Sequence, residues 1–247
     1  NIHITRSVAN SNSTSSWLPG TAFLPYSQSR CWSIQKEYYK KAKLLAWEAN
    51  GPVPCGVSSN IFVAKQYLDI ITNQAEQAAA IQGCDKEPFI VTIVEAGAGH
   101  GAVSLLLARL LSHNNSSNAA NNIQYRVICT DFHAGVFVQL LTLPWVKQLC
   151  EHGYLNFGVL DADTVSTDES KFHLLYKSKK EIHHPISNLL VVVGQYLFDS
   201  LATDLFAVSK EEGLFEIGVA SLDHDKELNN NIRKRKWKNS GKKERYV

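Results

Sequence analysis

A glycine-rich turn between an apolar run and an apolar-periodic segment constrains the fold of this chain more than any other feature. The sequence E-A-G-A-G-H-G occupies positions 95–101. Before it, 88–94 is rich in β-branched and aromatic residues and predicts a buried strand. After it, 104–111 has the broad apolar face of a helix. Alternate glycines let the backbone turn sharply and approach a ligand at a helix N-terminus. The pattern predicts a strand–loop–helix unit, either ligand-binding or purely structural.

The glycine spacing and the acid before it favour one class of ligand. A dinucleotide loop reads G-x-G-x-x-G, whereas the third glycine comes one residue earlier here. The Glu95 carboxylate would repel a pyrophosphate, but it suits the amine and sulfonium of S-adenosylmethionine. The run over 95–101 resembles the first motif of class I S-adenosylmethionine-dependent methyltransferases, an acid followed by G-x-G-x-G. The resemblance implies that this loop holds the methionine part of the cofactor, through Glu95, Gly97, Ala98, Gly99 and Gly101.

Short strands alternate with helical or loop segments after this point, which favours a parallel sheet. The predicted strands are 89–94, 125–130, 155–160, 189–193 and 214–219. The expected fold class is α/β, a doubly wound Rossmann-like methyltransferase sheet with an N-terminal helical segment. Class I sheets end with two further strands. The polar stretch after Leu222 leaves little room for them, so we expect a truncated C-terminal end.

Composition divides the chain into four parts. They are a flexible leader at 1–30, an N-terminal helical segment at 31–84, the cofactor-binding Rossmann-like domain at 88–222 and a basic tail at 223–247. In the helical segment, Ser33 predicts the start of a helix to about 49, and Ser58 or Ser59 the start of one over 61–82. We expect this segment to cover the cofactor site. Polar excursions are expected at 112–122 and 173–184.

Carboxylates follow the second and third predicted strands. In open α/β sheets ligands bind beyond the carboxyl ends of the strands. Asp131 comes directly after the second strand, where its two oxygens can accept both ribose hydroxyls; the alternative is a helix cap. Asp161-Ala162, after the third strand, resembles the acid-plus-small pair with which such methyltransferases hold the adenine amine. Asp163 is the reserve, and an Asp-rich solvated turn is the alternative.

The loop after the fourth strand offers an amide, a phenol and a carboxylate within five residues. We expect Gln195 to contact the cofactor and Tyr196 and Asp199 to be catalytic, all three helping to orient the acceptor, with Asp199 as a proton acceptor. Gly194 would let the chain turn close to the cofactor. The alternative is an ordinary strand-to-helix turn in which Asp199 caps the helix.

A longer pattern resembles the MidA-like branch of these methyltransferases and related uncharacterised proteins. The segment L-F-D-S-L over 197–201 matches an apolar–apolar–Asp–small–apolar run of that branch. The upstream order Tyr38-Tyr39, Trp47, Gly51, Pro54 and 58–60 matches its amino-terminal region, so the resemblance spans 32–220. The branch includes an enzyme that methylates arginine on a protein, which implies a protein side chain as acceptor. The chain lacks the N/D-P-P-Y/F signature and the paired glutamates of other methyltransferases.

Charge and cysteine content restrict partners only loosely. No run of 18 apolar residues exists, so we expect no membrane-spanning helix. The five cysteines show no metal-ligand spacing, so no metal site is indicated, and they weakly favour an intracellular compartment, cytoplasmic or mitochondrial. Residues 231–247 hold eight Lys and Arg against one Glu, which leaves nucleic-acid binding open. The oligomeric state stays open.

These patterns together predict an S-adenosylmethionine-dependent methyltransferase acting on a protein side chain. One alternative is a catalytically inactive S-adenosylmethionine-binding assembly or scaffolding protein. A nucleotide-dependent oxidoreductase is a further alternative, against which the glycine spacing and Glu95 argue.

Overall fold

The computed structural model describes residues 2–6, 24–48, 51, 53, 55–82, 87–114, 122–163, 173–175, 187–209 and 213–221. The chain forms two compact units. The larger comprises Ile34–Leu201, and the smaller comprises Asn1–Ser33 with Ala202–Val247. The tail predicted at 223–247 lies outside the described residues, as do most of the two polar excursions.

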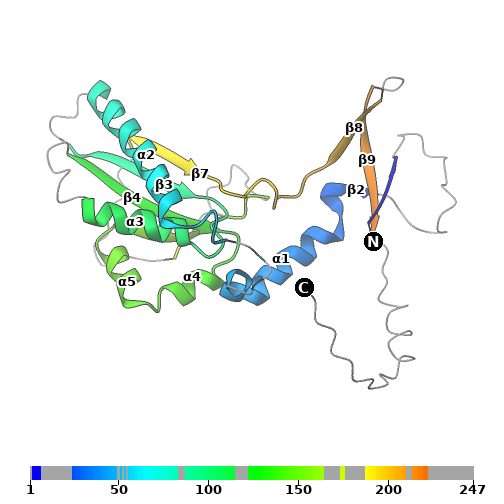
Figure 1. Cartoon of the computed structure of the whole chain (residues 1–247), viewed down its shortest axis with the longest axis horizontal. Helices are drawn as coiled ribbons and strands as arrows, with labels where there is room; N and C mark the ends of the chain where they lie inside the picture. Colours follow the sequence, from blue (N-terminus) through cyan, green and yellow to red (C-terminus); the bar gives the residue numbers. More distant parts are fainter. Residues whose placement is uncertain are drawn as a thin grey trace, which may run out of the picture. The chain divides into compact units, whose positions relative to one another are not determined.

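A mostly parallel sheet forms the centre of the larger unit (Figure 1). Its strands are β3 (Phe89–Glu95), β4 (Ile123–Asp131), β5 (Leu155–Val159), β6 (His173–Leu174) and β7 (Leu189–Val193), in the order β6-β5-β4-β3-β7. The short β6 pairs antiparallel with β5, and the other neighbours are parallel. The chain starts at β3, adds β4 and β5 on one side and then crosses to β7 on the other. The α/β class and the Rossmann-like sheet are confirmed.

Helices precede and connect these strands. They are α1 (Arg30–Ala42), the 3-10 helix η2 (Lys43–Trp47), α2 (Ile61–Gln82), α3 (Ala102–Asn114), α4 (Gly135–Leu140) and α5 (Pro144–Glu151). The predicted caps are wrong. The helix α1 begins before Ser33, whose hydroxyl donates to the Arg30 carbonyl. Asn60 caps α2 instead of Ser58 or Ser59, because its Oδ1 accepts the N–H groups of the second and third helical residues at 3.0 and 3.1 Å.

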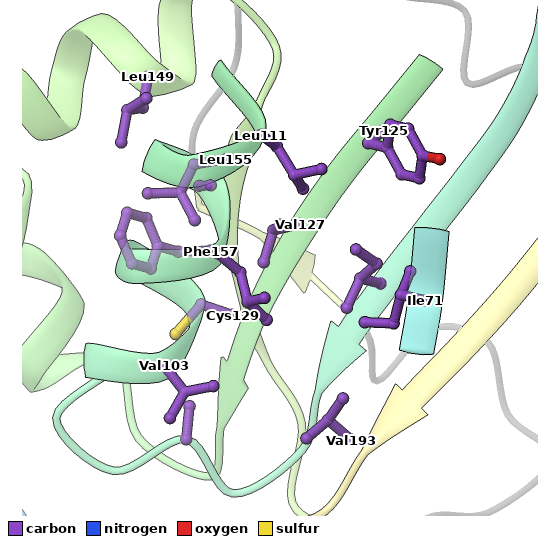
Figure 2. Close-up of a cluster of buried hydrophobic side chains, with 14 of the residues drawn as sticks. Ile71, Val103, Leu111, Tyr125, Val127, Cys129, Leu149, Leu155, Phe157 and Val193 are labelled. Carbon is purple, nitrogen blue, oxygen red and sulfur yellow. The ribbon is translucent and has the colours of Figure 1, made fainter. Parts of the chain in front are cut away.

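The core of the larger unit lies between the sheet and the helices α2, α3, α4 and α5. The helix α3 contacts both α2 and α5. Figure 2 shows Ile71 from α2, Val103 and Leu111 from α3 and Leu149 from α5 among side chains of the strands. At its centre the rings of Phe137 and Phe157 lie 5.0 Å apart. This packing fixes the strands whose carboxyl ends carry the predicted site residues.

The smaller unit holds an antiparallel sheet that the sequence did not predict. Its elements are β1 (Ile2–Arg6), β2 (Leu24–Pro25), η1 (Tyr26–Gln28), β8 (Leu205–Ser209) and β9 (Gly213–Ser221). The strand β9 pairs antiparallel with β1, β2 and β8. The strand expected at 214–219 therefore exists but does not belong to the parallel sheet, and the expected leader contributes two strands. Alternation along one strand does not reveal its partners, which lie some 200 residues away here.

Truncating Phe157 should strongly destabilise the larger unit. The side chain is fully buried, so Phe157→Ala leaves a cavity and should lower the free energy of unfolding by about 3–5 kcal/mol. Phe62→Ala on α2, where the ring is 68% exposed, is the matched control and should change it by about 0.5 kcal/mol or less. Urea unfolding measures both. Equal losses for the two variants would contradict this description of the core.

Candidate ligand site at the carboxyl ends of the strands

The loop between β3 and α3 depends on its glycines for conformation and for packing. Gly97, Gly99 and Gly101 have φ angles of 67°, 56° and 74°, in the left-handed region that side chains disfavour. A Cβ at position 97 would lie 2.7 Å from a methyl carbon of Leu197, and one at position 99 would lie 2.7 Å from the ring of Trp47. The glycines are therefore required both by backbone conformation and by the chain segments that pack on the loop.

Hydrogen bonds from the loop to the end of β4 hold it in place. The Ala98 N–H donates to the Thr130 carbonyl at 2.9 Å, and the Gly99 N–H donates to Asp131 Oδ2 at 2.8 Å. Burial raises the pKa of Asp131 to about 6, although backbone N–H groups oppose the shift. The helix α4 begins at Gly135 with no side-chain cap, so the helix-cap alternative for Asp131 is wrong.

Glu95 ends β3 as a buried acid that is 3% exposed. Its Oε2 accepts the backbone N–H of Ser104 at 3.0 Å and the Ser104 hydroxyl at 2.5 Å. Burial raises the pKa of Glu95 to about 7; the two bonds from Ser104 oppose this, and the charge of Asp131 adds to it. Glu95 therefore anchors the start of α3, a role that the sequence did not reveal because Ser104 reads as one more helical residue.

The end of β5 carries an ion pair that the sequence did not predict. Lys36 Nζ on α1 lies 3.0 and 3.1 Å from the two oxygens of Asp161 and 2.7 Å from Asp163 Oδ2. Burial opposes the Lys36 charge, but the two carboxylates outweigh it and raise the pKa of the amine. The Asp163 N–H also donates to Asp161 Oδ1 at 3.2 Å. The Asp-rich turn exists, and its carboxylates are bound by a lysine.

The loop after β7 places its polar groups beside the glycine loop. Gln195 Nε2 donates to the Ser58 carbonyl at 2.9 Å. Tyr196 is 68% exposed and has a φ of 53°, a strained value for a residue with a side chain. Asp199 is exposed in a turn, and the next element is the strand β8, so the alternative in which Asp199 caps a helix is wrong.

Two aromatic side chains of the N-terminal segment, Tyr39 and Trp47, cover the glycine loop, and Trp47 stacks on His100 of the loop. Trp47 stacks on Tyr39 at 5.3 Å and on His100 at 5.7 Å, with interplanar angles of 16° and 9°. Burial raises the pKa of Tyr39, and the nearby charges of Asp131 and Asp199 add to the shift. Burial also lowers the pKa of His100. The sequence marked Tyr39 and Trp47 only as parts of a family-like pattern, because a helical aromatic residue does not reveal what it covers.

These groups line one cavity of about 430 Å³ in the larger unit. Every predicted site residue lines it except Gly101, which lies against Cys129 and Leu140 behind the loop. Its charged lining, among the described residues, consists of one lysine and five carboxylates, which are Lys36 and Glu95, Asp131, Asp161, Asp163 and Asp199. The cavity thus has an excess of negative charge, favourable to a ligand with cationic groups.

Comparisons with known proteins give a partial similarity. No protein-family model matches the chain, and no solved structure matches it. The chain is similar to the protein named probable polyketide synthase 39 of Dictyostelium discoideum, with 28% identity over 175 residues. The similarity covers 62% of this chain, which spans only 6% of the length of the synthase. Among the described residues, no helix is long and apolar enough to cross a membrane.

The buried acid at the end of β3 should make stability depend on pH. The pKa of Glu95 is about 7 in the folded chain and near 4.5 when exposed. Its stabilising contribution to the free energy of unfolding is therefore fully present below about pH 4.5. That contribution is lost as the pH rises through 7. Relative to Glu95→Gln, the wild type should lose on the order of 2 kcal/mol between pH 5 and pH 8 in urea unfolding.

The exposed Glu151 on α5 offers a matched control. Glu151→Gln should reproduce the wild-type profile, because its carboxylate is not buried. Parallel profiles for the wild type and Glu95→Gln would contradict the raised pKa.

Proposed function

We propose that this chain binds S-adenosylmethionine in the cavity and is a methyltransferase. The observation that carries the proposal is the meeting of the G-x-G-x-G loop with carboxylates from three strand ends in a single cavity. Ligands of open α/β sheets bind at this edge, next to the point where the strand order reverses, as it does between β4, β3 and β7. The cavity volume lies within the range of roughly 300–1,000 Å³ usual for small-molecule sites.

The donor set of the cavity fits this cofactor better than a dinucleotide. A pyrophosphate would lie near Glu95 and Asp131, whose raised pKa values already express the cost of burying negative charge. The ammonium and sulfonium of S-adenosylmethionine would reduce that cost. The oxidoreductase alternative is therefore disfavoured on electrostatic grounds as well as by the glycine spacing.

Each strand end would hold one part of the cofactor. Glu95 and the loop residues would bind the methionine part, and Asp131 would accept the ribose hydroxyls. Asp161 and Ala162 would hold the adenine. The amide of Gln195, fixed by the Ser58 carbonyl, would contact the cofactor from the β7 side.

The remaining polar groups of the β7 loop would serve the acceptor. Bound S-adenosylmethionine supplies a methyl group on a cationic sulfur, which an acceptor atom attacks in line. Asp199 would take the proton that the acceptor gives up, and Tyr196 would orient the acceptor at the exposed mouth of the cavity. Holding acceptor and methyl donor in line can lower the barrier by about 7–11 kcal/mol in favourable cases.

Two acceptor classes follow from different observations. The resemblance of 32–220 to the MidA-like branch favours a protein side chain. The partial similarity to a polyketide synthase adds a polyketide to the acceptors worth testing.

Calorimetry with S-adenosylmethionine, S-adenosylhomocysteine and NAD tests cofactor binding. We expect both adenosyl compounds to bind and NAD not to bind. Asp131→Asn should weaken binding at least about tenfold, because it removes a charged hydrogen-bond acceptor. Its amide oxygen can still accept the Gly99 N–H and keep the loop in place. Asp69→Asn, on the exposed side of α2, should leave the affinity unchanged. Failure of the folded wild type to bind either adenosyl compound would sink the proposal.

A variant of Asp199 separates binding from transfer. Asp199→Asn should keep the affinity for S-adenosylmethionine and lower methyl transfer about 100-fold, the lower end of the usual contribution of a positioned base. Release of S-adenosylhomocysteine, followed by mass spectrometry with protein and polyketide acceptors, measures the transfer. Undiminished transfer by Asp199→Asn would remove the proposed role of this carboxylate.

An inactive assembly or scaffolding protein is the second candidate, and one observation favours it. Among the described strands β7 pairs only with β3, and its Leu190 and Val192 are 60% and 62% exposed. Exposed apolar side chains on a sheet edge are typical of surfaces that other proteins cover. Cofactor binding without transfer to any acceptor would favour this candidate.

A further inference from the structure

Residues 34–47, here called the strap, lie across the ends of three strands of the larger unit. At the end of β5, Lys36 binds Asp161 and Asp163. After β4, Lys36 and Lys40 place their amines 5.9 and 6.0 Å from the ring centre of Phe132. After β3, Trp47 packs on the glycine loop. The strap therefore forms one wall of the cavity.

The strap packs against the core at its end, through Leu44 and Trp47, whereas α1 is attached by polar and aromatic contacts. The helix α1 contains no buried residue, and η2 contains only Ala46. Segments with few buried apolar contacts open at low cost in free energy. Where α1 meets η2, Lys43 has a φ of 51°, a left-handed conformation that marks a break between the two helices. Movement of α1 would thus leave the sheet and its core intact, whereas movement of η2 would also break the packing of Leu44 and Trp47.

The ion pair of Lys36 lies at the proposed position of the adenine amine. Lys36 Nζ lies within hydrogen-bond distance of both Asp161 oxygens, one of which would have to accept the ligand amine. Asp163 Oδ2 is even nearer to Lys36, at 2.7 Å. Opening of the strap therefore breaks the contacts of Lys36 with both carboxylates.

We infer that the strap gates the cavity for the amine-bearing ligand and that Lys36 is its latch, which holds the strap closed through Asp161 and Asp163. The inference rests on the proposed function for the identity of that ligand. Opening of the strap then precedes binding. Only the open fraction of the molecules can bind, so the apparent association rate is lower than that of a cavity that is always open. Weakening the latch raises that rate, and salt, which screens the partly exposed ion pair, has the same effect.

Hydrogen exchange of the ligand-free chain tests the latch independently of any ligand. In Lys36→Gln the backbone amides of 34–47 should exchange about fivefold faster than in the wild type, the upper range for a partly exposed ion pair. Asp163→Asn should act in the same direction. Lys41→Gln is the matched control on the same helix. Lys41 is 81% exposed and pairs with Glu37 at 3.7 Å within α1, so this variant should change the rates by about twofold or less. Unchanged exchange in both Lys36→Gln and Asp163→Asn overturns the latch.

Stopped-flow association of S-adenosylhomocysteine tests the gate. This probe has no net charge, so a salt effect reports on the protein and not on attraction of the ligand. Association should be about fivefold faster for Lys36→Gln than for the wild type. Raising the salt concentration should accelerate the wild type much more than the variant. Binding with equal rates and equal salt dependence overturns the gate. Faster exchange in Lys36→Gln, with no binding by the wild type, overturns the proposed cofactor and leaves the latch in place.

Discussion

The hydrogen bond from the Gly99 N–H to Asp131 is the contact on which the cavity depends. It joins the loop after β3 to the end of β4, beside the bond from Ala98 to the Thr130 carbonyl. Without it the Gly99 amide would lack its partner, and the bond from Ala98 would remain as a backbone link between the loop and the end of β4. Because the carboxylate is drawn toward the loop, Asp131 is both a structural acceptor and a candidate ligand contact.

Negative charge is the second constraint on this site. Burial raises the pKa of both Glu95 and Asp131, since a carboxylate loses hydration in the cavity without gaining a cation beside it. Ser104 stabilises Glu95 only in part. A site built in this way disfavours anions and accepts cations, which is the physical basis for preferring a sulfonium cofactor to a dinucleotide.

Local patterns in the sequence sufficed for four strands of the sheet. They did not suffice for β6, which lies in the expected polar excursion at 173–184, or for the contacts across the sheet. Four strands, β3, β4, β5 and β7, were predicted because each is a short apolar run bounded by turn residues. Because they are parallel, their carboxyl ends meet at one edge of the sheet. The glycine loop could be predicted from spacing alone. The partners of Lys36 lie 125 residues or more away, and no pattern within α1 distinguishes it from Lys40 or Lys41. The strands β1 and β2 were missed for the same reason, because their pairing with β9 is long-range.

The lysine on α1 also explains how a carboxylate-rich cavity can form without a ligand. Five acids in one lining repel each other, and Lys36 offsets part of the negative charge of the two at the end of β5. The chain thus supplies from its own N-terminal segment a positive charge like the one that a cationic ligand would bring. Under the proposed gate, the same ion pair offsets part of the carboxylate charge and holds the strap closed. Stability of the empty site and access to it are then linked through one ion pair. A substitution that strengthens this ion pair should stabilise the empty site and slow the association of the ligand.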